Sequence, residues 1–157
     1  MFTRQLDVQR IIDSDLLPNN EQLQLWVEKA LSEYKYDAEI VIRIVDAEEM
    51  LDLNSQYRGK QGTTNILSFP LDLPDEVEGV DLLGDLVICS EVLQEEAKDQ
   101  NKQLLDHWAH IIIHGVLHLL GYDHIEEADA LEMENKERIL LQKLHIDNPY
   151  LEKEVNG

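Results

Sequence analysis

The chain has 157 residues, a size typical of one compact domain. Hydrophobic residues make up 43% of it and charged residues 29%, which permits a buried core and excludes a disordered or fibrous protein. With 13 basic side chains against 33 acidic ones, the formal net charge is -20. An acidic surface of this kind repels phosphate backbones, so a nucleic-acid substrate would need a local basic site or a bound cation.

Cysteine content and hydropathy bear on where the protein works. Cys89 is the only cysteine, which excludes an internal disulfide and a cysteine-based zinc site and suits a reducing cytosol. The first ten residues lack the basic-then-apolar order of a signal peptide. The longest uncharged apolar stretch, residues 108–122, is too short for a membrane span and contains three histidines. We therefore expect a soluble, cytoplasmic protein with no membrane partner.

Hydrophobic periodicity and turn residues predict strands and helices in alternation. The first half of the chain is predicted to form a weak strand at 2–12, a helix at 21–35, a strand at 39–45 and a helix at about 47–57. Strands at 65–69 and 84–89 follow, and then helices at 90–98, 102–120 and 126–144. The acidic stretch 72–81 contains no basic residue and predicts a solvated, mobile loop. The fold class is therefore α+β, a single domain over residues 1–157 with a small mixed sheet of about four strands and about five helices.

Capping residues mark several of the predicted boundaries. Asn20 and Ser90 are candidate helix caps, and Asp46 with Glu49 three positions later resembles a capping box. Gly121 ends the helix at 102–120, which is apolar nearly all round and is expected to be central. The last helix carries one stripe made of Ala130, Met133, Glu137, Leu140, Leu141 and Leu144.

Three histidines near the end of the central helix form the main candidate site. His114 and His118 are four positions apart, so they project from the same helical face. Gly121 allows a sharp turn that can fold His124 back toward them. Two buried imidazoles without a common partner would be unfavourable, so the spacing favours a shared metal ion. Three imidazoles leave coordination positions open, as in catalytic rather than structural zinc sites.

The remaining histidines have simpler interpretations. His107 and His145 are interpreted as hydrogen-bonded core residues. His110, one turn before His114, could support the metal site, but a core position is the preferred interpretation. Metzincin proteases share the three-histidine spacing and carry a glutamate directly after the first histidine as general base. Gly115 occupies that place here and cannot transfer a proton, which disfavours a peptidase.

Basic residues are scarce in the middle of the chain. Arg58 and Lys60 are the only cations between residues 44 and 97, among 13 acids. A guanidinium matches the geometry of phosphate oxygens, so Arg58 is a candidate phosphate-binding residue, although a solvated turn explains the composition equally well. Asn65, Ser68 and Asp85 lie in or beside short strands, where their default role is to satisfy backbone groups.

Three segments of the chain carry recognisable motifs. The run HGVLHLLGYDH (114–124), preceded by HWAHIII (107–113), resembles the metal-binding motif of the YbeY family of bacterial endoribonucleases. The segments YRGKQGTTNILSFP (57–70) and LLGDLVIC (82–89) resemble its two other signature blocks, in the same order. The length also matches, so the resemblance covers essentially the whole chain.

The resemblance implies an α+β domain in which His114, His118 and His124 hold a Zn²⁺ ion and His114 also takes part in catalysis. It implies a single-strand-specific, metal-dependent endoribonuclease in late 16S rRNA 3′-end maturation and 70S ribosome quality control. The partners would be the 16S rRNA precursor and the ribosome or ribosomal proteins. Arg58 falls on the functionally important arginine of the family, whereas many members have aspartate in the place of Asn65.

On this interpretation, the metal lowers the pKa of a bound water and polarises the phosphodiester, and Arg58 stabilises the charge of the transition state. His110, Asp123 and Glu127 are candidate general bases, and none is preferred. Two alternatives remain open: a metallohydrolase acting on a peptide or small ester, and a ribosome assembly factor with a structural metal. Three imidazoles suit nickel, copper and zinc alike, so the sequence does not identify the metal.

Overall fold

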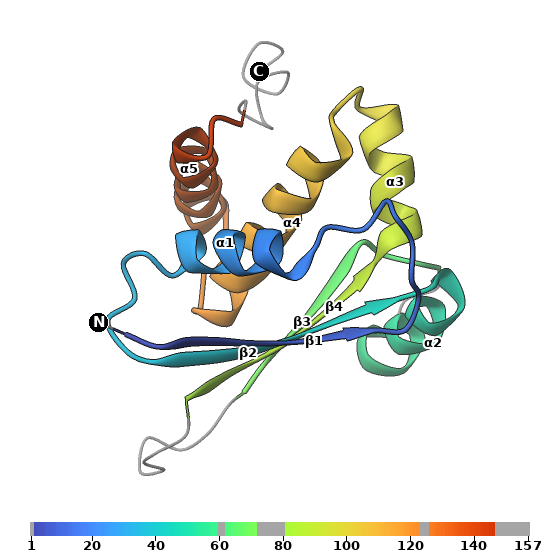
Figure 1. Cartoon of the computed structure of the whole chain (residues 1–157), viewed down its shortest axis with the longest axis horizontal. Helices are drawn as coiled ribbons and strands as arrows, with labels where there is room; N and C mark the ends of the chain where they lie inside the picture. The colour runs from blue at the N-terminus through green and yellow to red at the C-terminus, as the bar shows by residue number, and fades with distance from the viewer. Residues whose placement is uncertain (1, 60–61, 72–80, 123–125, 147–157) are drawn as a thin grey trace.

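The computed structural model describes residues 2–59, 62–71, 81–122 and 126–146. The elements are β1 (Arg4–Arg10), α1 (Asn20–Ala30), β2 (Ala38–Val45), α2 (Ala47–Arg58), β3 (Ile66–Pro70), β4 (Leu82–Cys89), α3 (Ser90–Asp99), α4 (Leu104–Leu119) and α5 (Glu127–Lys143). The predicted α+β fold, with a four-stranded sheet and five helices, is confirmed (Figure 1).

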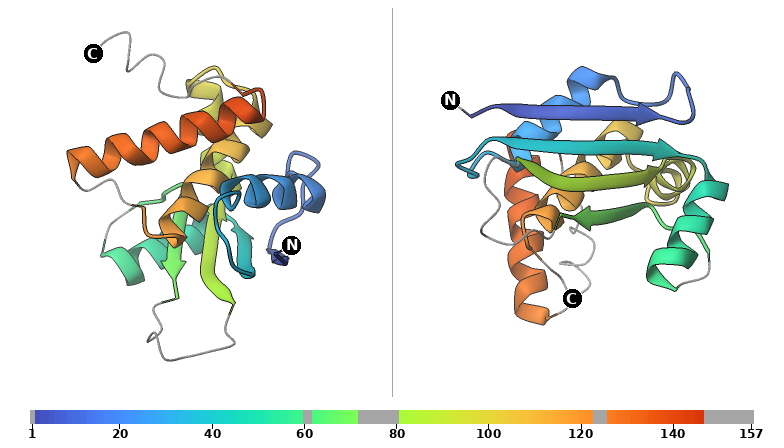
Figure 2. Two further views of the ribbon diagram at one scale, coloured as in Figure 1. Left: turned by 90° about the vertical axis from the view of Figure 1, so that its left-hand side faces the viewer. Right: turned by 90° about the horizontal axis from the view of Figure 1, so that it is seen from below.

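The sheet is mixed and has the strand order β1-β2-β4-β3 (Figure 2, right). β1 and β4 both run parallel to β2, whereas β3 is antiparallel to β4. The parallel pairs require helical crossovers, which α1 and the segment containing α2 provide. Because β3 is the last strand in this order, it lies at the edge of the sheet, and its outer side can line a pocket.

The two faces of the sheet bury different side chains because successive residues of a strand point to opposite sides. On one face, the β2 residues Ile40, Ile42 and Ile44 belong to the main core, together with residues of α1 and α4. On the other face, a smaller cluster is formed under α2 by Val45, Met50, Leu67, Val87 and Cys89. The main core lies beneath the helices drawn above the sheet in Figure 1.

Helix α4 is central, as its nearly continuous apolar sequence predicts. It packs against α1, α3, α5, β3 and β4, and most of its residues are buried. Gly115 permits this close approach: a Cβ atom there would lie 2.6 Å from Ile66 Cδ1 and 2.9 Å from Leu86 Cδ2. The glycine therefore brings α4 directly against β3 and β4.

Helix starts differ from the prediction in two places. Asn19, not Asn20, caps α1: its side chain accepts from the backbone N–H of Gln22, and the Gln22 side chain completes a capping box. Ser90 was also expected to act as a cap, but the N-cap position of α3 is Cys89. The Ser90 hydroxyl is buried and finds no hydrogen-bond partner among the residues described.

The predicted capping box of α2 is only half formed. Asp46 accepts a hydrogen bond from the backbone N–H of Glu49, as predicted. The Glu49 side chain does not return to Asp46, because it forms an ion pair with Arg43 at 2.7 Å instead. A tertiary partner on β2 has replaced the local one.

Two helix ends also bear on the predictions. Helix α1 ends at Ala30, earlier than the predicted end at residue 35, and Arg4 donates to the carbonyls of Leu31 and Tyr34 beyond it. Gly121 has a φ of 102° and follows the end of α4, as predicted. The acidic stretch 72–81, predicted to be a mobile loop, lies outside the described residues except for Asp81, so this prediction stays untested. Within that part, no helix is long and apolar enough to cross a membrane.

Candidate metal and phosphate site

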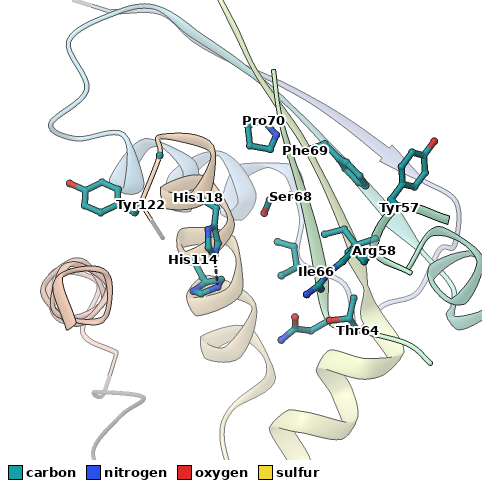
Figure 3. A pocket seen from close by; sticks show the side chains of 13 residues that line it. Tyr57, Arg58, Thr64, Ile66, Ser68, Phe69, Pro70, His114, His118 and Tyr122 are labelled. Carbon is teal, nitrogen blue, oxygen red and sulfur yellow. Dashed lines mark hydrogen bonds between the residues drawn. The ribbon is translucent and has the colours of Figure 1, made fainter. Parts of the chain in front are cut away.

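A pocket of about 700 Å³ lies between β3, the C-terminal part of α4 and the end of α2 (Figure 3). Its volume is in the range typical of small-ligand sites. The described residues that line it are Tyr57, Arg58, Thr64, Asn65, Ile66, Leu67, Ser68, Phe69, Pro70, His114, His118, Gly121 and Tyr122. Residues from the segments 57–70 and 114–124 thus meet in one cavity.

The two histidines of α4 lie side by side in this pocket, as their spacing predicts. The Nε2 atoms of His114 and His118 face each other at 3.1 Å, and the ring centroids are 4.6 Å apart. Two nitrogens bound to one tetrahedral zinc ion at about 2.0–2.1 Å would lie roughly 3.3 Å apart. The pair therefore fits a shared metal ion with little adjustment.

The third predicted ligand, His124, lies outside the described residues, so its position relative to the pair stays a prediction. Among the residues described, no group of three histidine, cysteine, aspartate or glutamate side chains is arranged to hold a metal ion. The residues present supply two of the three predicted imidazoles. Asp123, one of the candidate bases, is also outside the described part.

Glu137 of α5 reaches the far side of the His114 ring. Its side chain is fully buried, and Oε1 accepts a hydrogen bond from His114 Nδ1 while Oε2 lies 3.6 Å from His110 Nε2. Burial alone would raise the pKa of Glu137, but its interactions with His110 and His114 outweigh burial and lower the pKa to about 2. Glu137 is therefore an ionised carboxylate inside the protein.

The position of Glu137 in the sequence is the one signal that could have indicated its role. Glu137 falls in the apolar stripe of the last helix, where the sequence gives it no function. A glutamate in such a stripe is rarely fully buried unless it is paired, so its position indicates a partner on a neighbouring helix. Which partner it meets depends on the packing of α5 against α4.

His110 supports the carboxylate and does not face the substrate pocket. It is mostly buried and is not among the described residues that line the pocket. Burial lowers its pKa, and the neighbouring Glu137 opposes that effect only in part. His110 therefore lies beside Glu137 as a neutral ring, with its Nε2 beyond hydrogen-bond distance of Oε2. Glu127, another candidate base, is exposed at the first turn of α5 and is likewise absent from the described lining.

A second carboxylate–histidine pair lies next to the pocket. His107 is buried, as predicted, and its Nε2 is 3.0 Å from Glu96 Oε1. Burial raises the pKa of Glu96, but hydrogen bonds from His107 and Asn65 lower it overall. His145 was also expected to be a core residue, and that prediction is wrong: it is exposed just beyond α5.

Asn65 links this pair to the pocket. It lines the cavity, and its Nδ2 donates to Glu96 at 3.2 Å. Its default interpretation, a side chain that satisfies nearby backbone groups, is therefore wrong for the amide nitrogen. An aspartate at this position would place a second carboxylate against Glu96 and would lose the donor.

Arg58 lies in the pocket wall opposite the histidines. It was expected to begin a loop, but it is the last residue of α2, and Gly59 in the left-handed conformation (φ 64°) ends the helix directly after it. Figure 3 shows its side chain extending from α2 toward Ile66 and the pocket. It is exposed and is the only arginine or lysine among the described lining residues.

An aromatic pair at the pocket rim was not anticipated from the sequence. The rings of Tyr57 and Phe69 meet edge to face with centroids 5.3 Å apart, and Tyr57 is 64% exposed. Both side chains line the pocket beside Arg58 (Figure 3). No local pattern predicts this contact, because the two residues come from α2 and β3.

The other two polar candidates of the strands differ in position. Ser68 of β3 lines the pocket, whereas Asp85 of β4 is exposed and is not among the described lining residues.

The chain is similar to known proteins in sequence and in fold. Residues 10–145 match the family model described as "Endoribonuclease YbeY". The chain is 52% identical over 151 residues to "Endoribonuclease YbeY" of Colwellia psychrerythraea, an alignment covering 94% of this chain and 97% of that protein. The solution structure of TM1509 from Thermotoga maritima is similar with a TM-score of 0.62 and 26% identity, over 99% of this chain and 94% of that one.

Proposed function

The chain belongs to the YbeY endoribonuclease family, and we propose that it cleaves single-stranded RNA with the help of a metal ion held by His114, His118 and His124. One observation carries this proposal: the facing Nε2 atoms of His114 and His118 and the guanidinium of Arg58 line the same pocket. A cation site and a phosphate-binding group are two elements that metal-assisted phosphodiester hydrolysis uses.

The roles of the side chains follow from their chemistry. A bound zinc ion would supply Lewis acidity and a water of lowered pKa. His114 and His118 would hold the ion through the Nε2 atoms that face each other. Arg58 presents a planar fork of N–H donors to the phosphate oxygens, binds the scissile group opposite the histidines, and stabilises the negative charge that develops on it.

The charge distribution favours recognition inside the pocket. A net charge of -20 opposes loose binding of RNA to the outer surface. The metal site and Arg58 concentrate positive charge where the phosphate must lie. RNA is therefore bound at one place, or is delivered there by a partner that contacts the protein elsewhere.

The aromatic pair favours unpaired RNA. An exposed ring such as Tyr57 offers a surface on which one base can stack, and stacking of this kind contributes about 1–3 kcal/mol per base without sequence preference. A base in a duplex is already stacked and paired, so it would first have to be unpaired and unstacked, which costs free energy, before it could stack on this ring. We therefore propose specificity for single strands.

For the cellular role, we propose late 16S rRNA 3′-end maturation and quality control of the 70S ribosome, in the cytoplasm. The family resemblance supports this role. The acidic surface also supports it, because ribosomal proteins with basic segments would bind such a surface. The ribosome would then supply the RNA that the surface itself repels.

The proposed activity can be tested directly on the full chain. We expect zinc-loaded protein to cleave a single-stranded RNA, to spare the same sequence in a duplex, and to lose activity when a chelator is added. Casein serves as the control substrate and should remain intact. Proteolysis of casein without RNA cleavage would overturn the nuclease assignment in favour of another metallohydrolase.

Replacing Arg58 with alanine is expected to lower kcat/KM for single-stranded RNA by about 100- to 1,000-fold, because a charged donor to the transition state is lost. Zinc binding and thermal stability should stay unchanged, since the side chain is exposed. Arg138→Ala is the matched control, because this exposed arginine of α5 is not among the described lining residues. If Arg58→Ala cleaves RNA as fast as wild type, the assembly-factor alternative with a structural metal becomes the better one.

A further inference from the structure

We propose that Glu137 is a positioning residue that fixes the tautomer of His114, so that the proton is on Nδ1 and the free lone pair of Nε2 faces the metal position. This inference rests on the proposed metal site. The inference goes further than that site because it assigns a function to a residue of α5 that is not among the described pocket-lining residues.

The hydrogen-bonding capacity of the two groups determines the tautomer. An ionised carboxylate can only accept hydrogen bonds, so a ring nitrogen that contacts it must donate. His114 Nδ1 is the atom bonded to Glu137 Oε1. In a neutral imidazole the other nitrogen then carries a lone pair, and this nitrogen is the Nε2 that faces His118 at 3.1 Å.

The surroundings of Glu137 hold the carboxylate in one position. It is fully buried on the face of α5 that also buries Met133, Leu140 and Leu141. These apolar side chains offer the charged group no hydrogen bond, so it cannot rotate away from α4 without losing the hydrogen bond from His114. The ring plane of His114 is therefore fixed together with its tautomer.

His110 adds a second contact to the same carboxylate. Its Nε2 lies 3.6 Å from Oε2, one helical turn before His114 on α4. The two oxygens of Glu137 thus face two rings of one helix. A glutamine could not serve both in the same way, because one oxygen would be replaced by an NH₂ group that donates.

The chain contains a matched control for this arrangement. Glu96 accepts a hydrogen bond from Nε2 of the buried His107 in a second carboxylate–histidine pair. Neither of these two residues is among the described pocket-lining residues, although Asn65, which donates to Glu96, is one of them. Glu96→Gln therefore makes the same chemical change to a pair that does not hold the proposed ligand. A general effect of replacing a carboxylate that is paired with a histidine should appear in both variants.

The tautomers can be observed in metal-free protein by long-range ¹H–¹⁵N NMR correlation at mildly alkaline pH. We expect His114 of the wild type to be protonated on Nδ1, and His114 of Glu137→Gln to be a mixture of both tautomers. Glu96→Gln should leave the His114 signals unchanged. A wild-type His114 protonated on Nε2 would overturn the proposal, and this measurement does not require any variant to fold.

Zinc titration provides the second readout. Loss of a carboxylate behind a ligand histidine typically weakens metal binding by about 10- to 100-fold, so Glu137→Gln should bind Zn²⁺ that much more weakly, whereas Glu96→Gln should bind like wild type. Equal affinities in all three proteins would overturn the proposal. Neither readout uses RNA, so a failure of the proposed nuclease function would be seen separately, as absent cleavage by zinc-loaded wild type.

Discussion

His114→Ala is expected to abolish stoichiometric zinc binding and to lower RNA cleavage by roughly 1,000-fold or more, equivalent to about 4 kcal/mol of activation free energy. The substitution removes one of two imidazoles that face each other at 3.1 Å. It also removes a donor from the buried Glu137, which should reduce the free energy of unfolding by about 1–3 kcal/mol. Metal analysis, a cleavage assay and thermal unfolding of the same preparation would check all three effects.

His118→Ala separates the metal effect from the stability effect, because no contact between His118 and Glu137 is among those described. We expect the same loss of zinc and cleavage with a smaller change in melting temperature. His145→Asn is a control that removes an exposed imidazole at a left-handed position (φ 63°), where asparagine is tolerated. Retention of one zinc ion per chain by His114→Ala would contradict the proposed ligand set.

Gly84→Ala is expected to destabilise the protein by about 3 kcal/mol or more. Gly84 has a φ of 151°, and a Cβ atom there would lie 2.3 Å from the backbone oxygen of Phe69. A backbone atom cannot move aside without disturbing the pairing of Gly84 with Pro70. Because β3 also lines the pocket, we expect RNA cleavage to fall together with the unfolding free energy, measured by chemical denaturation.

Gly121→Ala is the matched control for Gly84→Ala. This glycine also has a positive φ, 102°, but no heavy atom of the described residues would lie within 4 Å of a Cβ added there. Only the conformational penalty of a positive φ remains, about 1–2 kcal/mol. If the two variants were equally stable, the steric contact with Phe69 would not be the reason for glycine at position 84.

The sequence was sufficient to predict the elements and the histidine pair because both depend on short-range periodicity. His114 and His118 are four positions apart on one long helix, so their proximity follows from helical geometry alone. The strand assignments likewise follow from runs such as residues 39–45. Features of this kind require no knowledge of how the elements pack.

The parts that were missed depend on contacts between distant segments. Glu137 meets His114 only because α5 packs on α4, and Tyr57 meets Phe69 only because α2 ends beside β3. Glu49 was expected to close a local capping box, but Arg43 on β2 competes successfully for its carboxylate. Tertiary partners of this kind override local preferences and leave no periodic signal.

The structure also gives a physical reason for Gly115. In the sequence, this glycine indicates only the absence of a protease general base. The direction of the missing Cβ, toward Ile66 and Leu86, shows that this position of α4 faces the sheet. A glutamate there would clash with the core before it could act in the pocket, so packing alone disfavours that residue.

The burial of Cys89 has a practical consequence for labelling the protein. Its side chain is fully buried beneath α2, and burial raises the pKa of the thiol, which makes it a poor nucleophile. Because the chain has no other cysteine, one introduced in place of Tyr57 would be the single thiol open to maleimide reagents. A fluorophore or photoactivatable probe could then be attached at the pocket rim without first removing native cysteines.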